Sequence, residues 1–254
     1  MIKQSVPHFF TSLNLLCGCF SIYFAYIFQF ETAFLFLLGG VFFDTWDGLF
    51  ARLMGVESEL GVQLDSMADM VTSGMAPGII LAQMFVLAGN HPLEVVLGWP
   101  INSVVEFIPW VFIGFILPLG SAFRLARFNI NRSRKNHFIG LPTPAMAMFF
   151  GSIPLIVQHP NLAFLKPIVI SNPGLILMAV LFVILMNTNL ILFSFKSFST
   201  GSVDLILRIL TITITSLFIV FFGLGGISFA VLFYLVLNLI KISILRIGND
   251  SNIY

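Results

Sequence analysis

Long apolar runs, separated by short connections, constrain this chain more than any other feature of its sequence. A helix needs about 20 apolar residues to cross a bilayer. Eight runs approach that length, at residues 8–28, 31–53, 64–88, 106–128, 143–159, 171–193, 203–222 and 225–246. Only 9% of the 254 residues are charged, against about 25% in soluble domains. We therefore predict an all-α, polytopic integral membrane protein with about eight transmembrane helices, forming a single membrane-embedded domain over residues 1–254.

The lysines and arginines predict how the chain is oriented, because these residues collect on the cytoplasmic side of membrane proteins. If both termini are cytoplasmic, eleven of the 12 lysines and arginines lie at or near cytoplasmic ends of the runs, and only Lys166 lies outside. An odd number of spans would remove this asymmetry. We therefore expect a multi-pass protein of the inner (cytoplasmic) membrane. The net charge of +1 argues against nucleic acid as a partner.

Ionisable residues are concentrated between residues 44 and 69, where the surrounding sequence predicts membrane. The segment reads D-T-W-D-G-L-F-A-R, then eight residues, then G-V-Q-L-D-S-M-A-D. Asp44 and Asp47 are three residues apart, and Asp65 and Asp69 are four apart, so each pair shares one helix face. With Arg52 at the cytoplasmic surface, Asp44 would lie about 12 Å deeper along the helix. The four carboxylates are therefore predicted to share one depth, facing the cytoplasm.

Four carboxylates so close together need compensating charge. Two divalent cations would supply it, and Mg²⁺ prefers carboxylate and phosphate oxygens. Two such ions are also a known device for displacement at phosphorus, because they clamp the attacking and leaving oxygens. A purely structural Asp–Arg network is the alternative, but one arginine cannot neutralise four aspartates. The segment therefore predicts transfer of a phosphorus-centred group at the membrane surface.

The pattern D-x2-D-G-x2-A-R-x8-G-x3-D-x3-D resembles the signature of the CDP-alcohol phosphatidyltransferases at every fixed position. The resemblance implies a helical membrane enzyme of phospholipid biosynthesis, usually a homodimer, which transfers the phosphatidyl group of a CDP-linked lipid to an alcohol and releases CMP. It implies two ions, Mg²⁺ or Mn²⁺, held by Asp44, Asp47, Asp65 and Asp69, with Asp69 also the general base. The resemblance further implies a CDP-lipid site at Gly48, Ala51, Arg52 and Gly61, where small residues let the cytidine and diphosphate approach the backbone.

Three further segments resemble the branch of this family that uses serine as acceptor. They are S-L-N-L-L-C-G from Ser12, F-R-L-A-R-F-N from Phe123 and F-I-G-L-P-T-P-A from Phe138. Arg124 and Arg127, three residues apart, could hold the carboxylate of L-serine, hold the phosphate of the substrate lipid CDP-diacylglycerol, or act only as cytoplasmic anchors beside membrane lipids. Asn14 is polar in an apolar run, and it reaches either the site or a neighbouring helix.

Two other functions remain open at this point. A sibling enzyme would accept glycerol 3-phosphate or inositol phosphate and should need a denser basic cluster, for which Arg132, Arg134 and Lys135 are candidates; otherwise these three attract anionic lipid. A cation or solute transporter would use the aspartates as its pathway, but the sequence shows no repeated halves.

Three local features complete the predictions. Pro77–Gly78 should kink the third span, and residues 89–105 and 129–142 should form the longest polar connections. The four histidines, including His8, are scattered along the chain, and each is interpreted as an ordinary loop or interface residue.

Overall fold

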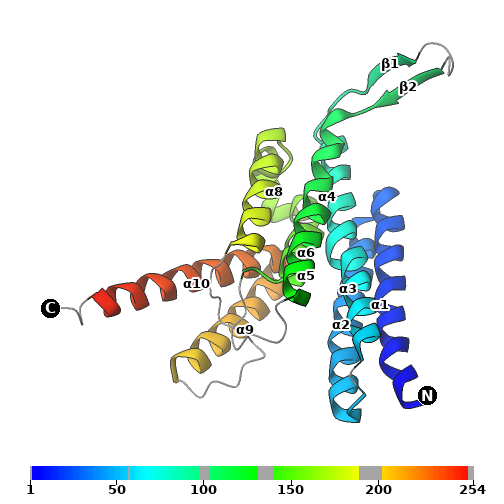
Figure 1. Cartoon of the computed structure of the whole chain (residues 1–254). Coiled ribbons are helices and arrows are strands. Elements are labelled where there is room, and N and C mark those ends of the chain that lie inside the picture. The colour runs from blue at the N-terminus through cyan, green and yellow to red at the C-terminus, as the bar shows by residue number, and fades with distance from the viewer. Residues whose placement is uncertain (1, 57, 98–102, 131–139, 189–201, 251–254) are drawn as a thin grey trace.

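The computed structural model describes residues 2–56, 58–97, 103–130, 140–188 and 202–250, and nearly all of them are helical (Figure 1). The first half contains α1 (Ile2–Tyr26), α2 (Phe30–Met54), α3 (Glu59–Asp69), the π-helical segment η1 (Met70–Met75), α4 (Ala76–Leu87), η2 (Pro109–Phe115) and α5 (Ile116–Ile130). The second half contains α6 (Thr143–Gln158), η4 (Pro160–Leu165), α7 (Lys166–Val169), α8 (Asn172–Asn187), α9 (Ser202–Phe222), η5 (Gly223–Gly225) and α10 (Gly226–Asp250). The prediction of an all-α, polytopic membrane protein is confirmed.

Each predicted span contains a helix, although not every helix is long enough to cross a membrane alone. Within the described residues, five stretches are long and apolar enough: Ser5–Tyr26, Phe30–Met54, Glu59–Leu87, Pro109–Ile130 and Leu205–Lys241. A sixth forms if Thr143–Gln158 and Pro160–Val169, which meet at 106°, make one broken span. The predicted sixth span holds the 16-residue helix α8, and the last two predicted spans make one stretch that η5 interrupts. The number of crossings remains a prediction.

Helices α1 and α2 lie side by side at one edge of the molecule, and α1 also contacts α3, η1 and α4 (Figure 1). A core cluster lies between α4, α6, α8 and α10, where the rings of Phe149 and Phe182 stack with centroids 4.2 Å apart. A second cluster joins α1 and α2 to the start of α4. Large apolar side chains such as Leu53 and Val220 remain exposed, as expected for surfaces that face lipid.

The connection predicted over residues 89–105 contains an element that the sequence analysis did not predict. Strands β1 (Leu93–Leu97) and β2 (Ser103–Phe107) form an antiparallel hairpin, with Leu93 opposite Phe107 and Val95 opposite Val105. The hairpin projects from the end of the molecule that lies opposite the N-terminus (Figure 1). Paired valines favour extended backbone. The helical part of the predicted fourth span therefore begins at Pro109 and not at residue 106.

The third span is distorted just before the predicted kink at Pro77. The N–H of Ala76 bonds to the carbonyl of Val71, five residues back, which is the π-helical pattern. Pro77 has no N–H to give the carbonyl of Ser73. The distortion therefore falls in η1, and Glu59–Leu87 continues as one stretch of 29 residues.

Candidate active site

A short turn reverses the chain between the two helices that carry the aspartates. Helix α2 ends at Gly55, whose φ of 62° is the left-handed conformation that favours glycine, and its N–H bonds back to the carbonyls of Ala51 and Arg52. Helix α3 begins after Ser58, whose hydroxyl accepts the N–H of Gly61 at 3.1 Å. The two caps end one helix and start the next within four positions. They bring the start of α3 beside the end of α2.

Three of the four predicted metal ligands meet at this reversal. Ligand oxygens of Asp44, Asp47 and Asp65 all lie within 4.8 Å of one another. Asp47 is 5% exposed, and its carboxylate accepts a hydrogen bond from Thr11 of α1 at 2.7 Å. One oxygen of Asp65, Oδ1, is buried without a hydrogen-bond partner. A buried carboxylate oxygen without a donor is costly, and a hard divalent cation would satisfy it.

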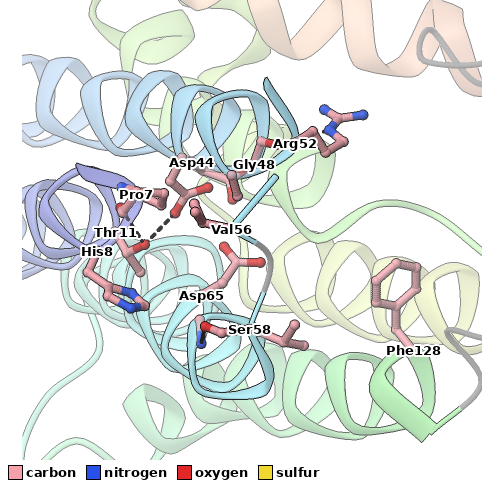
Figure 2. A pocket seen from close by; sticks show the side chains of 14 residues that line it. Pro7, His8, Thr11, Asp44, Gly48, Arg52, Val56, Ser58, Asp65 and Phe128 are labelled. Atoms are coloured by element: carbon pink, nitrogen blue, oxygen red, sulfur yellow. Dashed lines mark hydrogen bonds between the residues drawn. The ribbon is translucent and has the colours of Figure 1, made fainter. Parts of the chain in front are cut away.

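These carboxylates open onto a pocket of about 300 Å³ (Figure 2). Helix α1 supplies one side of it, α2 and α3 supply two more, and Phe128 of α5 stands at its edge. Its lining residues are Pro7, His8, Thr11, Asp44, Asp47, Gly48, Ala51, Arg52, Val56, Ser58, Gly61, Val62, Asp65 and Phe128. All four residues predicted to contact the CDP-lipid are among them.

The two glycines of the pocket have different surroundings. A Cβ placed on Gly48 would meet no atom within 4 Å, so the missing side chain leaves open space in the pocket. A Cβ on Gly61 would lie 3.1 Å from the Ser58 hydroxyl and 3.4 Å from the His8 ring. Gly61 therefore makes room for side chains of the protein itself, whereas Gly48 borders open space in the pocket.

Asp69 lies one helical turn beyond Asp65 and is not among the residues that line this pocket. Asn14 of α1 donates to its carboxylate, with 3.3 Å between Nδ2 and Oδ1. Arg124 of α5 interacts electrostatically with the same carboxylate. Asp69 thus lies beside the three clustered carboxylates and still interacts electrostatically with them, and it has an amide donor and a partly buried guanidinium as its other neighbours.

The two arginines of α5 contact different parts of the protein. Arg124 donates to the hydroxyl of Thr143, at the start of α6, at 3.3 Å, and its Nε is buried without a hydrogen-bond partner. Arg127 donates to the carbonyl of Asn187 at the end of α8, at 3.2 Å. Of the two, Arg124 is therefore the one directed toward Asp69.

The structure also places residues in the site that the sequence analysis did not predict there. His8 lines the pocket with its Nδ1 buried and unpartnered, and Thr11 fixes Asp47. Both belong to α1, in the segment V-P-H-F-F-T. No spacing pattern in this segment connected it with the aspartates. Arg132, Arg134 and Lys135 lie outside the described residues.

Comparison with known proteins agrees with this site. The family model for CDP-alcohol phosphatidyltransferase matches residues 4–186, which include α1 to α5, α6 and most of α8. This match covers all of the pocket residues and more than half of the chain. The resemblance stated from the aspartate pattern is therefore confirmed.

Several curated relatives are named CDP-diacylglycerol–serine O-phosphatidyltransferase. That of Helicobacter pylori (strain ATCC 700392 / 26695) is 33% identical over 144 residues, 56% of this chain and 54% of the relative. That of Bacillus subtilis (strain 168) is 32% identical over 143 residues, 56% of this chain and 71% of the relative. That of Methanocaldococcus jannaschii is 31% identical over 144 residues, 57% of each chain. The aligned region spans about half the length of the Helicobacter and Methanocaldococcus relatives.

Proposed function

The chain belongs to the CDP-alcohol phosphatidyltransferase family, and we propose that it transfers the phosphatidyl group of CDP-diacylglycerol to the hydroxyl of L-serine. The products would be phosphatidylserine and CMP. One observation supports the reaction type: the carboxylates of Asp44, Asp47 and Asp65 meet at a pocket of about 300 Å³, and Asp69 lies one helical turn beyond Asp65 in α3. The names of the relatives support serine as the acceptor.

Asp44, Asp47 and Asp65 would hold the divalent cations, Mg²⁺ or Mn²⁺, for which the orphaned oxygen of Asp65 is a suitable ligand. When bound, two ions would neutralise the diphosphate of the CDP-lipid and make CMP a better leaving group. The open space at Gly48 lets the nucleotide approach the backbone of α2, and Arg52 stands at the same wall of the pocket.

Asp69 would act as the general base. It takes the proton of the serine hydroxyl while that oxygen bonds to the lipid-side phosphorus and the bond from this phosphorus to the oxygen of CMP breaks. Asn14 directs an amide donor at the carboxylate, which suits an ionised acceptor. General-base assistance is worth about 10²–10⁴ in rate when the base lies within hydrogen-bond reach of the hydroxyl.

Arg124 would bind the carboxylate of serine. Its guanidinium lies near Asp69 and has a buried Nε without a partner, and a guanidinium matches a carboxylate in shape and charge. Thr143 holds this side chain from the start of α6. Arg127, bonded to the end of α8, would have a lesser part. The proposal includes a homodimer in the inner membrane, with the site facing the cytoplasm.

The acceptor assay tests the proposal directly. Purified protein receives CDP-diacylglycerol with labelled L-serine, glycerol 3-phosphate or inositol phosphate in separate reactions. We expect label to enter lipid only from serine, with one CMP released for each lipid formed. If label enters lipid only from glycerol 3-phosphate, that compound and not serine is the acceptor. Ion or solute flux without CMP release would show a transporter instead.

A further inference from the structure

Thr72 is a buried polar residue in η1, the π-helical segment that begins directly after Asp69, and it lies three residues beyond that aspartate. Its exposed fraction is 0%. Single π-helical turns are rare and occur frequently at functional sites. The wide turn places Thr72 against both α1 and α2, the helices that carry Asn14 and two of the clustered aspartates.

Two glycines form a socket around Thr72, one on each neighbouring helix. A Cβ on Gly18 of α1 would lie 2.5 Å from the Thr72 hydroxyl oxygen and 2.9 Å from its Cα. A Cβ on Gly40 of α2 would lie 2.5 Å from the Thr72 methyl carbon. Real Cβ atoms essentially never come within 3.0 Å of another heavy atom. The absence of both side chains therefore lets Thr72 fit between the two helices.

Asn14 connects this socket to Asp69. The Thr72 hydroxyl donates to the backbone carbonyl of Asn14 at 2.9 Å, and the Asn14 side chain donates to the Asp69 carboxylate. Asn14 is 0% exposed. Asn14 therefore accepts a hydrogen bond from Thr72 through its backbone carbonyl and donates one to Asp69 through its side chain.

We propose that Thr72 is a positioning residue for the reaction: through Asn14 it sets where the Asp69 carboxylate lies relative to the three clustered aspartates. This inference rests on the proposed function, in which Asp69 is the general base. The base oxygen must lie about 2.6–3.2 Å from the hydroxyl oxygen whose proton it takes, and a displacement of about 1 Å can cost about 10²-fold in rate. Loss of the Thr72 hydrogen bond should therefore lower turnover and leave binding of the CDP-lipid unchanged.

Two substitutions separate the hydroxyl from the methyl group. Thr72→Val keeps the shape that fills the socket but removes the donor to Asn14. We expect kcat to fall about ten- to hundredfold, with the KM for serine and the affinity for CDP-diacylglycerol, measured by calorimetry in detergent, within about twofold of wild type. Thr72→Ser keeps the donor and should recover most of kcat.

A compensating pair tests the same socket from the other helix. Gly40→Ala should lower kcat because its Cβ displaces the Thr72 methyl group and presses on the Asn14 side chain, whose Oδ1 would be 3.0 Å away. Combining Gly40→Ala with Thr72→Ser removes the closer of these clashes and should restore part of the lost kcat. A non-additive effect in this double-mutant cycle is expected for residues that are in contact or share one hydrogen-bond network, and not for independent sites.

Four outcomes would overturn the inference or the proposed function on which it rests. A wild-type kcat for Thr72→Val would show that the hydroxyl has no role. Equal loss of kcat and of CDP-lipid binding in both the valine and serine variants, without recovery in the double variant, would show a packing residue only. A fully active Asp69→Asn enzyme, measured alongside, would overturn the proposed base itself. An inactive Asp69→Asn enzyme with an unaffected Thr72→Val would overturn the positioning role alone.

Discussion

The four signature aspartates occupy two different environments, although the sequence spaces them as two similar pairs. The oxygens of Asp44, Asp47 and Asp65 lie within 4.8 Å of one another at the pocket, where Gly48 borders open space. Asp69 lies one turn along α3, outside the pocket lining, and contacts Asn14. The difference is the one expected under the proposed function, in which the three clustered carboxylates hold cations and Asp69 accepts a proton.

The helices that support each environment also differ. The three clustered carboxylates depend on the reversal between α2 and α3, with its glycine and serine caps. Asp69 depends instead on α1 and α5, which bring an amide and a guanidinium from distant parts of the chain. Damage to one environment should therefore leave a different kinetic signature from damage to the other.

Of the changes that test this difference, metal removal should lower the enzymatic activity most. Chelation with EDTA should abolish activity, and Mg²⁺ or Mn²⁺ should restore it, because ions near the phosphorus would stabilise the transition state by several kcal/mol. Asp65→Asn should lower kcat by about 10³-fold or more and should weaken Mn²⁺ binding measured by electron paramagnetic resonance. Full activity after exhaustive chelation would exclude the ions from the reaction.

Asp69→Asn should come next, with turnover reduced about 10²–10⁴-fold because the general base is lost. Binding of CDP-diacylglycerol, measured by calorimetry in detergent with Mg²⁺ present, should remain close to that of wild type. If binding of the lipid or of Mn²⁺ falls as far as in Asp65→Asn, Asp69 is chiefly a metal ligand, and the division into two environments fails.

Arg124→Gln should raise the KM for serine about ten- to hundredfold, because a charge-assisted hydrogen bond is worth about 1.5–3 kcal/mol. The KM for CDP-diacylglycerol should change little. Arg127→Gln is the matched control, since its guanidinium contacts the end of α8, and its KM for serine should stay within about threefold. A rise in the KM for CDP-diacylglycerol in the Arg124 variant would assign this arginine to the lipid phosphate.

Gly48→Ala should have the smallest effect and the most selective. The new methyl group would meet no protein atom within 4 Å, and alanine favours helix by about 0.5–1 kcal/mol over glycine, so thermal stability should hold or rise. The KM for CDP-diacylglycerol should increase about fivefold, because the methyl group occupies space meant for the ligand. Gly61→Ala should behave differently and lower the melting temperature, since its methyl group crowds Ser58 and His8. Equal behaviour of the two variants would contradict the distinction between these glycines.

Helical spacing placed Asp44 with Asp47, and Asp65 with Asp69, on shared helix faces, and their predicted depth placed the two pairs at one level. Asp44 and Asp47, three residues apart, do meet Asp65 across the turn. Spacing could not separate Asp69 from the others, because that depends on where α1 and α5 lie. The sequence allowed Asn14 either to reach the site or to bond to a neighbouring helix. Its hydrogen bond to Asp69 of α3 does both.

Thr72 and the β-hairpin show what a periodicity argument misses. A period of 3.6 residues per turn holds only for a regular α-helix. It therefore does not predict the π-helical turn that places Thr72 against Gly18 and Gly40. Strands β1 and β2 are each five residues long, which is too short to stand out beside apolar runs of about 20. Paired valines in both strands were the available signal.

The projecting β-hairpin, which lies far from the pocket, offers a binding site for an antibody fragment. It extends from the end of the bundle away from the N-terminus of α1 and the C-terminal end of α2, where the pocket lies (Figure 1). An antibody fragment raised against its strands would add mass and an asymmetric landmark to a 28.2 kDa protein while leaving substrate entry free. Electron microscopy of the particle with substrate bound would then be practical.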